Sequence, residues 1–300
     1  MDEGIRVVAQ GRSRYDDGVL GGDTDSERRR LAAMAAVCDP TTTRVLSDLG
    51  VATGWRCLEV GAGNGSIARW LAQRVSSMPS PSAGSGPSAS SGHAVSERAA
   101  SGHVIATDVD VSQLTRLVSP DLTVLRHDIT RDPRPDGGPF DLVHARFVLE
   151  HLPEREQVLD RLLAWLKPGG VIVVESIAEF PLDSSPHPAF RDAMRSVADV
   201  LAHTIGTDCA WARGFPGLLL RRGLVEVGAM VHLPATGGAG ASAQCWALTL
   251  ARLRQHILDR DPTLAETVDQ TFDLLADPAF FDFAFATAIA WGTAPRAGAR

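Results

Sequence analysis

The fold of this chain is decided by the stretch CLEVGAGNGS at residues 57–66. A short apolar run carries an acid near its end and opens into three glycines at every second position. Ile67, Trp70 and Leu71 follow at helical spacing, which predicts a buried strand, a tight turn and the start of a helix. Glycines let the backbone approach a ligand closely, and a helix N-terminus presents unpaired N–H groups. The sequence therefore predicts a small-molecule site at this turn.

The spacing of the glycines separates two classes of nucleotide site. The dehydrogenase fingerprint has its third glycine three residues after the second, but that position is Ser66 here and the glycine comes early, at Gly65. A nicotinamide-dependent oxidoreductase therefore fits the loop poorly and is kept as an alternative. An ordinary turn between a strand and a helix, without a ligand, is the other open interpretation of the loop taken alone.

Composition limits the class of protein. The chain has 300 residues, 44% of them hydrophobic, and a formal net charge of −7, which gives no sign of a nucleic-acid or anionic-membrane partner. Its four cysteines are scattered, so we expect neither a metal site nor a disulfide framework. No leader-like or membrane-length apolar run is visible in the sequence. We expect a cytoplasmic protein with one enlarged domain, either a monomer or a homodimer.

Strands and helices alternate through the middle of the chain. The apolar stripe after Pro153 predicts a helix that ends at residues 167–170 (KPGG), and further helices are expected from Ser66 and from Val111. Near-continuous apolar strands are typical of a parallel sheet covered on both faces, so the fold class is α/β with a doubly wound sheet. The expected strands lie at residues 56–60, 103–107, 122–126, 140–144 and 171–175.

Residues 1–50 are expected to form an N-terminal arm and two helices. Thr24 and Glu27 make a capping box for a helix to about residue 37, and Asp39 followed by Pro40 predicts the start of a second helix. The arginine run at residues 28–30 is expected to lie on a solvated helix face.

The remaining segments depart from the alternating pattern. Residues 76–102 are rich in Ser, Pro, Gly and Ala, which predicts a disordered insertion. After residue 175 we expect helices at about 188–205 and 218–222, a strand at 225–233, a helical stretch at 243–275 that is broken near Asp261, and an alternating segment at 281–286 that continues to Trp291.

Several motifs together resemble those of class I S-adenosylmethionine (SAM) dependent methyltransferases. The glycine loop resembles their motif I, and the acid Asp108 ends the next strand. Asp108 lies 43 residues after Gly65, and removing an insertion of roughly 20 residues restores the expected spacing of about 20. RHDI at residues 126–129, HARFVLEHLP at 144–153 and LKPGG at 166–170 follow in the family's order. The resemblance covers about residues 40–180, with a weaker match at the end.

The resemblance implies a Rossmann-like sheet of seven strands, six parallel and the last antiparallel. It places a methyltransferase domain at residues 51–300. Helical insertions at about 186–222 and 243–276 are then expected to form a lid, the second of them between the sixth and seventh strands.

The resemblance also assigns residues to the methionine end of SAM. Glu59 orients the loop, the glycines back onto the methionine part, and the carbonyl of Ala145 and the side chain of Arg146 hold the amino-acid group. The loop glycines in question are Gly61, Gly63 and Gly65.

For the adenosine end, the resemblance assigns four residues. Asp108 binds the two ribose hydroxyls, since an ionised carboxylate can accept a hydrogen bond from each of them. Val109 lies against the adenine, Asp128 accepts from the adenine amino group, and Ile129 packs on the ring face.

The implied reaction is attack of a substrate nucleophile on the methyl carbon of SAM, which leaves S-adenosylhomocysteine (SAH) as the product. The sulfonium already activates the methyl group, so the protein mainly aligns the partners and excludes water. A general base is needed only where the nucleophile must lose a proton. The catalytic candidates are Tyr15, His144, His151 and Glu175, and His187 is a further one.

The acceptor is expected to be a small, apolar or aromatic metabolite of bacterial specialised metabolism, methylated on O, N or C. Trp246 and the aromatic residues near the C-terminus, such as Phe285, are interpreted as core, and any of them that faces the cleft would favour an apolar or aromatic acceptor. Besides the oxidoreductase, a SAM-binding regulatory protein without transferase activity stays open as an alternative.

Overall fold

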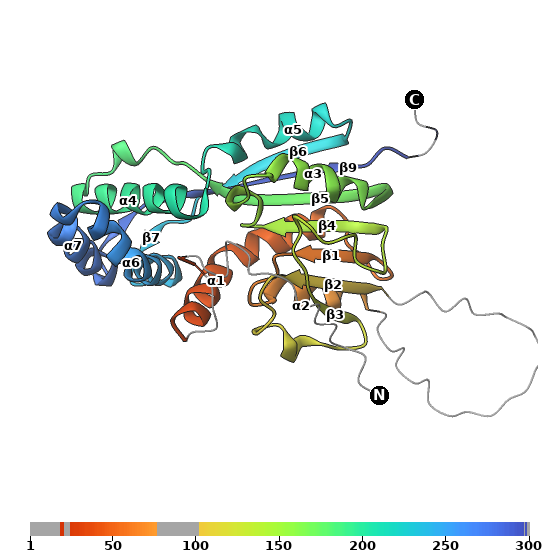
Figure 1. Ribbon diagram of the computed structural model, residues 1–300, viewed down its shortest axis with the longest axis horizontal. Helices are drawn as coiled ribbons and strands as arrows, with labels where there is room; N and C mark the ends of the chain where they lie inside the picture. Colours follow the sequence, from red (N-terminus) through yellow and green to blue (C-terminus); the bar gives the residue numbers. More distant parts are fainter. Residues whose placement is uncertain (1–18, 21–24, 77–101, 297, 299–300) are drawn as a thin grey trace, which may run out of the picture.

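The computed structural model describes residues 19–20, 25–76, 102–296 and 298. Among these residues, the chain forms a seven-stranded sheet with helices on both faces (Figure 1). The helices are α1 (Asp25–Asp48), α2 (Ser66–Val75), α3 (Arg155–Ala164), α4 (Pro188–Ile205), α5 (Phe215–Arg221), α6 (Ala241–Arg260) and α7 (Ala265–Ala276). The strands are β1 (Arg56–Val60), β2 (His103–Asp108), β3 (Leu122–Arg126), β4 (Phe140–Arg146), β5 (Leu166–Ala178), β6 (Val225–His232), β7 (Thr236–Gly237), β8 (Phe281–Asp282) and β9 (Ala286–Thr293).

The order of the strands in the sheet is β3-β2-β1-β4-β5-β9-β6. β9 runs antiparallel to both β5 and β6, and the other described strands of this sheet are parallel to one another. The expected arrangement of six parallel strands and an antiparallel last strand is therefore confirmed. The order reverses between β1 and β4, and ligands of open α/β sheets bind beyond the carboxyl ends of the strands at such a point.

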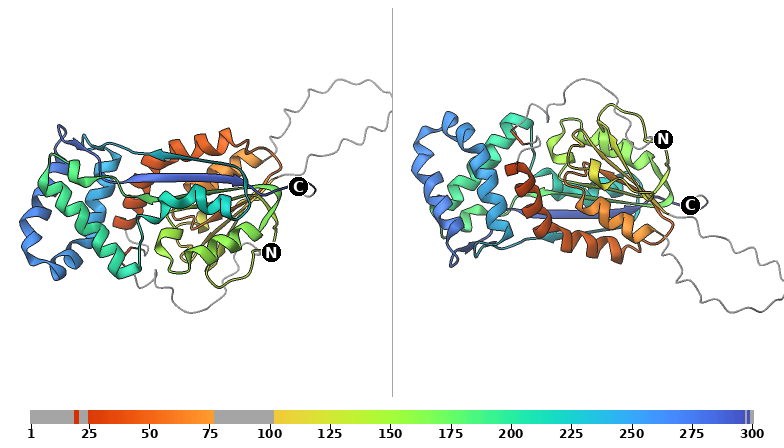
Figure 2. Two further views of the ribbon diagram at one scale, coloured as in Figure 1. Left: turned by 90° about the horizontal axis from the view of Figure 1, so that it is seen from above. Right: turned by 90° about the horizontal axis from the view of Figure 1, so that it is seen from below.

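Two clusters of buried side chains hold helices against the two faces of the sheet. Leu46 of α1 and Leu71 of α2 belong to the cluster on one face. Leu159 of α3 and Leu219 of α5 belong to the cluster on the other face. Figure 2 shows α1 and α2 in orange on one side of the strands and α3 in green on the other. This two-sided cover explains why the strands are apolar along nearly their whole length.

A third cluster lies beyond the sheet, where α4, α6 and α7 pack together (left in Figure 1). Phe190 and Val197 of α4 meet Leu250 of α6 and Val268 of α7 there. In the chain, α6 and α7 lie between β6 and β9, and their bounds agree with the helical stretch expected there. The N-terminal part of α1 lies against α6, so α1 reaches from the sheet to this helical group.

The prediction of two N-terminal helices is wrong, because a single helix, α1, runs through Pro40. Proline fixes a backbone angle that a helix accepts, and its missing N–H costs one helical hydrogen bond. The Thr43 hydroxyl donates to the Asp39 carbonyl at 2.8 Å. The Asp39 carboxylate does not start a helix here but bonds to side chains from β4 and α2.

Three local expectations also differ from the structure. The residues from Val111 form turns and a 3-10 helix at Thr115–Leu117 instead of a regular helix. The helix expected to end at residues 167–170 ends earlier, at Ala164, and those residues belong to β5, where Gly169 and Gly170 exchange backbone hydrogen bonds with Ala294 at 2.9 and 2.8 Å. The alternating segment at 281–286 splits into the short strand β8, which pairs with β7, and the start of β9.

Several expectations concern residues outside the described part of the chain. Tyr15, most of the expected N-terminal arm and Thr24 of the expected capping box lie there, and so does nearly all of the segment expected to be disordered at about 76–102. Within the described part, none of the helices combines the length and apolarity needed to cross a membrane.

Candidate functional site

The glycine loop between β1 and α2 has the left-handed backbone that its sequence predicts. Gly61, Gly63 and Gly65 have φ angles of 65°, 56° and 74°. The loop is closed by the Gly65 N–H, which donates to the Ala62 carbonyl at 2.8 Å, and it is joined to β2 where the Ala62 N–H donates to Thr107. A Cβ atom at Gly61 would overlap the Val148 side chain, so this position needs glycine for space as well as for conformation.

Asp108, at the end of β2, faces this loop. One carboxylate oxygen accepts from the Gly63 N–H at 2.8 Å and the other from the Asp110 N–H at 3.1 Å. Burial raises the pKa of Asp108 to about 6, although these two backbone bonds favour its ionised form. The acid therefore holds the loop in place while it lines a cavity.

The cavity lies over the carboxyl ends of the strands and has a volume of about 780 Å³. That volume is typical of small-molecule sites. Eight of the ten residues predicted for the cofactor line it: Glu59, Gly61, Gly63, Asp108, Val109, Asp128, Ile129 and Arg146. Gly65 instead packs toward Leu114 and Leu117, and Ala145 is buried within β4.

At the end of β3, Asp128 shapes the chain as well as lining the cavity. One carboxylate oxygen accepts from both the N–H and the hydroxyl of Thr130, at 2.9 and 2.6 Å. The other lies 3.6 Å from the Arg131 guanidinium. These hydrogen bonds of the carboxylate stabilise a turn, which fixes the loop beside Ile129.

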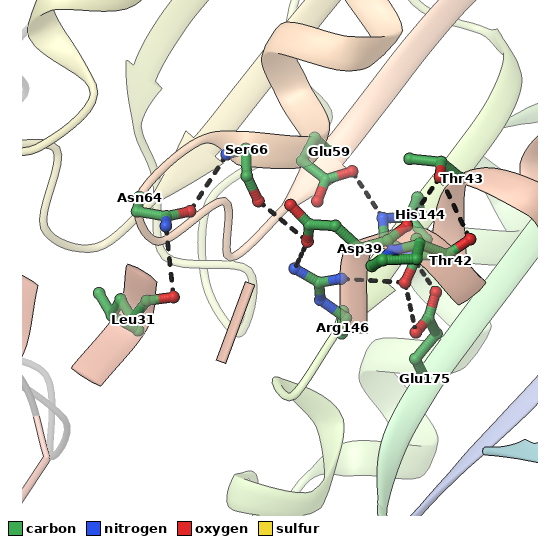
Figure 3. A network of polar contacts seen from close by, with 11 residues as sticks. Leu31, Asp39, Thr42, Thr43, Glu59, Asn64, Ser66, His144, Arg146 and Glu175 are labelled. Atoms are coloured by element: carbon green, nitrogen blue, oxygen red, sulfur yellow. Dashed lines mark hydrogen bonds and ion pairs between the residues drawn. The ribbon is translucent and has the colours of Figure 1, made fainter. Parts of the chain in front are cut away.

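A buried row of charged side chains joins the ends of β1, β4 and β5 (Figure 3). His144 Nδ1 lies 2.6 Å from a Glu59 oxygen, and Nε2 lies 3.1 Å from a Glu175 oxygen. Burial disfavours a charged His144, but the two carboxylates outweigh that effect and raise its pKa to about 9. The ring is therefore protonated at neutral pH, and it donates a hydrogen bond to each acid. His144 and Glu175 are fully buried within this row.

The row continues from Glu175 to α1 and Arg146. The Thr42 hydroxyl donates to the second Glu175 oxygen at 2.9 Å and accepts from Arg146 at 2.9 Å. Arg146 also donates to Asp39 at 2.8 Å, and the Ser66 hydroxyl lies 3.2 Å from the same Asp39 oxygen (Figure 3). Two residues of α1 thus hold the guanidinium that the family resemblance assigned to the amino-acid group of SAM.

A 3-10 helix after β4, Leu149–His151, brings two titratable residues to the cavity wall. The His151 ring lies 2.8 Å from the Thr207 hydroxyl, and burial together with the positive charges of Arg30 and Arg155 lowers its pKa to about 4. The ring is therefore neutral at pH 7.

Glu150 is the residue of this wall that sequence reasoning missed. Its carboxylate accepts from the Ser176 hydroxyl at 2.9 Å and the Ile177 N–H at 3.1 Å, and burial raises its pKa to about 7. The signal that could have found it is an acid within the apolar run FVLEHL.

The other half of the cavity is mainly apolar. It is lined by side chains from α1, α4, α6 and the residues that lead into β9, and these include Met34, Leu201, Trp246 and Phe285. A buried ion pair accompanies them on α1, where Arg30 donates to both oxygens of Glu27 at 2.9 and 2.6 Å. The expectation of a solvated arginine run is therefore wrong for Arg30, because its place on α1 turns it toward α6 and the cavity.

Comparisons with known proteins agree with this geometry. A family model described as "Methyltransferase domain" matches residues 27–206. The chain belongs to this family, and it is a member of the class I SAM-dependent methyltransferases that its motifs resemble.

Individual relatives match only part of the chain. Over 135 residues it is 30% identical to the ubiquinone/menaquinone biosynthesis C-methyltransferase UbiE of Laribacter hongkongensis, which is 43% of this chain and 46% of that protein. Over 40 residues it is 50% identical to methyltransferase str3 of Strobilurus tenacellus, which is 13% of this chain and 14% of that one. The chain thus spans less than half the length of these curated relatives.

Solved structures share the fold. YcgJ of Bacillus subtilis matches with a TM-score of 0.53 and 12% identity, over 85% of this chain and 98% of that one. The protein BH2331 of Bacillus halodurans matches with a TM-score of 0.50 and 14% identity, over 84% and 98%. These likenesses support the Rossmann-like sheet.

The glycine loop generates a prediction about stability. Gly61→Ala is expected to lower the free energy of unfolding by about 2–4 kcal/mol, because the new methyl group overlaps Val148 and the left-handed backbone is strained. Gly63→Ala is the matched control, since it has a similar φ angle with open space around it, and it should cost only about 1–2 kcal/mol. Urea denaturation measures both, and equal losses would contradict the close contact with Val148.

The charged row generates a prediction about pH. Because the pKa of His144 is raised from 6.5 to about 9, its contribution to stability is complete below pH 6.5 and is lost as pH rises through about 9. The free energy of unfolding should fall by about 3 kcal/mol over this window. Urea denaturation at several pH values tests this, and His144→Gln should remove the dependence. A histidine ring signal that titrates near pH 6.5, with no signal that titrates near 9, would refute the assignment.

Proposed function

We propose that this chain transfers a methyl group from SAM to an O, N or C nucleophile of a small, apolar or aromatic metabolite. The single observation that carries the proposal is a continuous cavity with two different ends. One end has the glycine loop, Asp108 and Arg146, and the other has the apolar side chains of α1, α4 and α6.

The residues at the polar end fit SAM. Gly61 and Gly63 present backbone without side chains, which leaves room for the methionine part beside Glu59. The Asp108 carboxylate lines the cavity and accepts hydrogen bonds, as two ribose hydroxyls require. Arg146 has donors beyond those bound to Thr42 and Asp39, and these suit a carboxylate.

When bound, SAM supplies an activated methyl group, so the chain's own residues bind and orient the partners and exclude water. On the acceptor side, His151 is proposed to contact the nucleophile, since its neutral ring lines the cavity. His144 and Glu175 are proposed to act from within the buried row rather than on the acceptor. Tyr15 stays a candidate outside the described residues.

The wider setting is also proposed. The apolar lining supports an apolar or aromatic acceptor, and bacterial specialised metabolism is the context we favour. The helical segments at about 186–222 and 243–276 are proposed to cover the acceptor as a lid on the domain at 51–300. All four cysteines lie in the described part of the chain and carry free thiols, which supports a reducing cytoplasm.

Cofactor binding tests the proposal first. SAH should bind in a calorimetric titration, whereas NAD should not. Asp108→Asn should weaken SAH binding about tenfold or more, because a neutral amide replaces an acceptor-only carboxylate. Asp160→Asn is the matched control. Asp160 is an exposed acid of α3 that pairs with Arg222, so this variant should bind SAH as the wild type does.

Methyl transfer is tested second. Mass spectrometry of reactions with a panel of phenolic and indolic acceptors should show a gain of one methyl group. Binding of NAD without SAH would overturn the proposal. Binding of SAH with no methylated product from any acceptor would favour the SAM-binding regulatory protein instead.

A further inference from the structure

We propose that α1 is a positioning element of the cofactor site, in which Thr42 and Asp39 orient Arg146 and the Glu175–His144–Glu59 row holds Thr42 in turn. This inference rests on the proposed function, because it assigns the residues that act behind the SAM contacts. None of these four supporting residues, Thr42, Asp39, His144 and Glu175, was assigned such a role by the sequence.

The direction of each hydrogen bond at Thr42 is fixed by chemistry. Arg146 is only a donor and an ionised Glu175 is only an acceptor, so the single hydroxyl proton of Thr42 must point to Glu175. Its lone pair then accepts from Arg146, and both contacts are 2.9 Å long. Thr42 is fully buried, so water does not replace either partner.

The other end of the row is ordered in the same way. Glu59 and His144 are neighbours in the register of β1 and β4, and Arg146 and Glu175 are neighbours in the register of β4 and β5. His144 satisfies both acids only when each ring nitrogen carries a proton. The row therefore has one set of donors and acceptors, which runs without a break from Glu59 to Arg146.

Asp39 supplies the second point of support for Arg146. The guanidinium is planar, so bonds from two of its nitrogens to Thr42 and Asp39 fix its plane as well as its place. The same Asp39 oxygen lies 3.2 Å from the hydroxyl of Ser66, the first residue after the glycine loop. One residue of α1 thus links Arg146 to the loop (Figure 3).

The position of the two ends argues for a role in binding. Apolar residues of the same volume would hold α1 on the sheet about as well as a buried ion network does, so stability alone does not explain why charged groups stand here. Glu59 and Arg146, the two ends of the row, both line the cavity, and His144 and Glu175 lie buried between them. The row therefore connects the two side chains assigned to the methionine end of SAM.

Thr42→Val tests the proposal, because it keeps the shape of the side chain and removes its hydroxyl. SAH should bind about tenfold more weakly, with a similar rise in the KM for SAM and a smaller change in kcat, since Arg146 and Glu175 each lose one of their hydrogen-bond partners. Thr42→Ser should restore most of the affinity. Thr43→Val is the matched control: Thr43 is the next residue of α1, and its hydroxyl donates to a backbone carbonyl of the helix.

The same titrations distinguish the possible outcomes. Wild-type affinity in Thr42→Val overturns this inference and leaves the proposed function standing, and so does an equal loss in Thr43→Val. Absence of SAH binding in the wild type overturns both. If Thr42→Val melts far below the wild type, Asp39→Asn serves as a second variant. Asp39 is partly exposed, and replacing its carboxylate weakens the bond to Arg146, so SAH affinity should fall here as well.

A pH series separates positioning from plain structural support. His144 is faced by Glu59 from β1 and by Glu175 from β5, and Thr42, Arg146 and Asp39 lie beyond Glu175. Burial raises the pKa of the Cys38 thiol, which lies near Arg146 and Glu175, to about 12, so this thiol stays protonated. SAH affinity should fall as pH rises through about 9 in the wild type. His144→Gln should bind weakly at every pH and should lack the part of that step that comes from His144. SAH's own amino group titrates in both proteins, so an equal step in both contradicts the role of His144.

Discussion

The structure depends on one interaction, a protonated histidine held between two carboxylates at the ends of three strands. Two buried acids without a cation would cost several kcal/mol, and His144 supplies that cation where β1, β4 and β5 meet. Glu175 also needs a donor from outside the sheet, which Thr42 of α1 provides. Burial of this charge is thus complete only when α1 is docked, and the matched family domain begins at residue 27, within α1.

Because α1 continues past the sheet, it takes part in both halves of the cavity. Its C-terminal half carries Asp39 and Thr42, which meet the polar end, and its N-terminal half carries Glu27, Arg30 and Met34, which line the apolar end. Any movement of α1 would therefore disturb the support of Arg146 and the apolar wall of the cavity together. This shared element gives the two ends of the cavity a fixed separation, which alignment of two reacting partners requires.

Local periodicity predicted the strands and the glycine loop, and the motifs that resemble those of the family led to ten residues of which eight line the cavity, because both signals come from contiguous residues. Neither signal predicted the partners of Asp39 and Thr42, which lie 107 and 133 residues away along the chain. An aspartate before a proline has the same local pattern whether its carboxylate caps a helix or bonds to a distant arginine, so the pattern favoured a helix start. The exposure of Arg30 was predicted wrongly for a related reason. Three consecutive arginines on a helix point in different directions, and only Arg30 is buried.

The charge states at the apolar end follow from the same burial. His151 is neutral at pH 7 because its pKa is lowered to about 4, and Glu150 is only partly ionised because its pKa is raised to about 7. The Glu27–Arg30 pair is internally compensated. This wall of the cavity therefore presents little net charge to an acceptor, whereas the opposite end presents Asp108, Glu59 and Arg146. If the acceptor is weakly polar, as we propose, the cost of desolvation would keep the charged cofactor and the acceptor at opposite ends of the cavity, so the electrostatics would sort the two partners before the acceptor atom makes any contact.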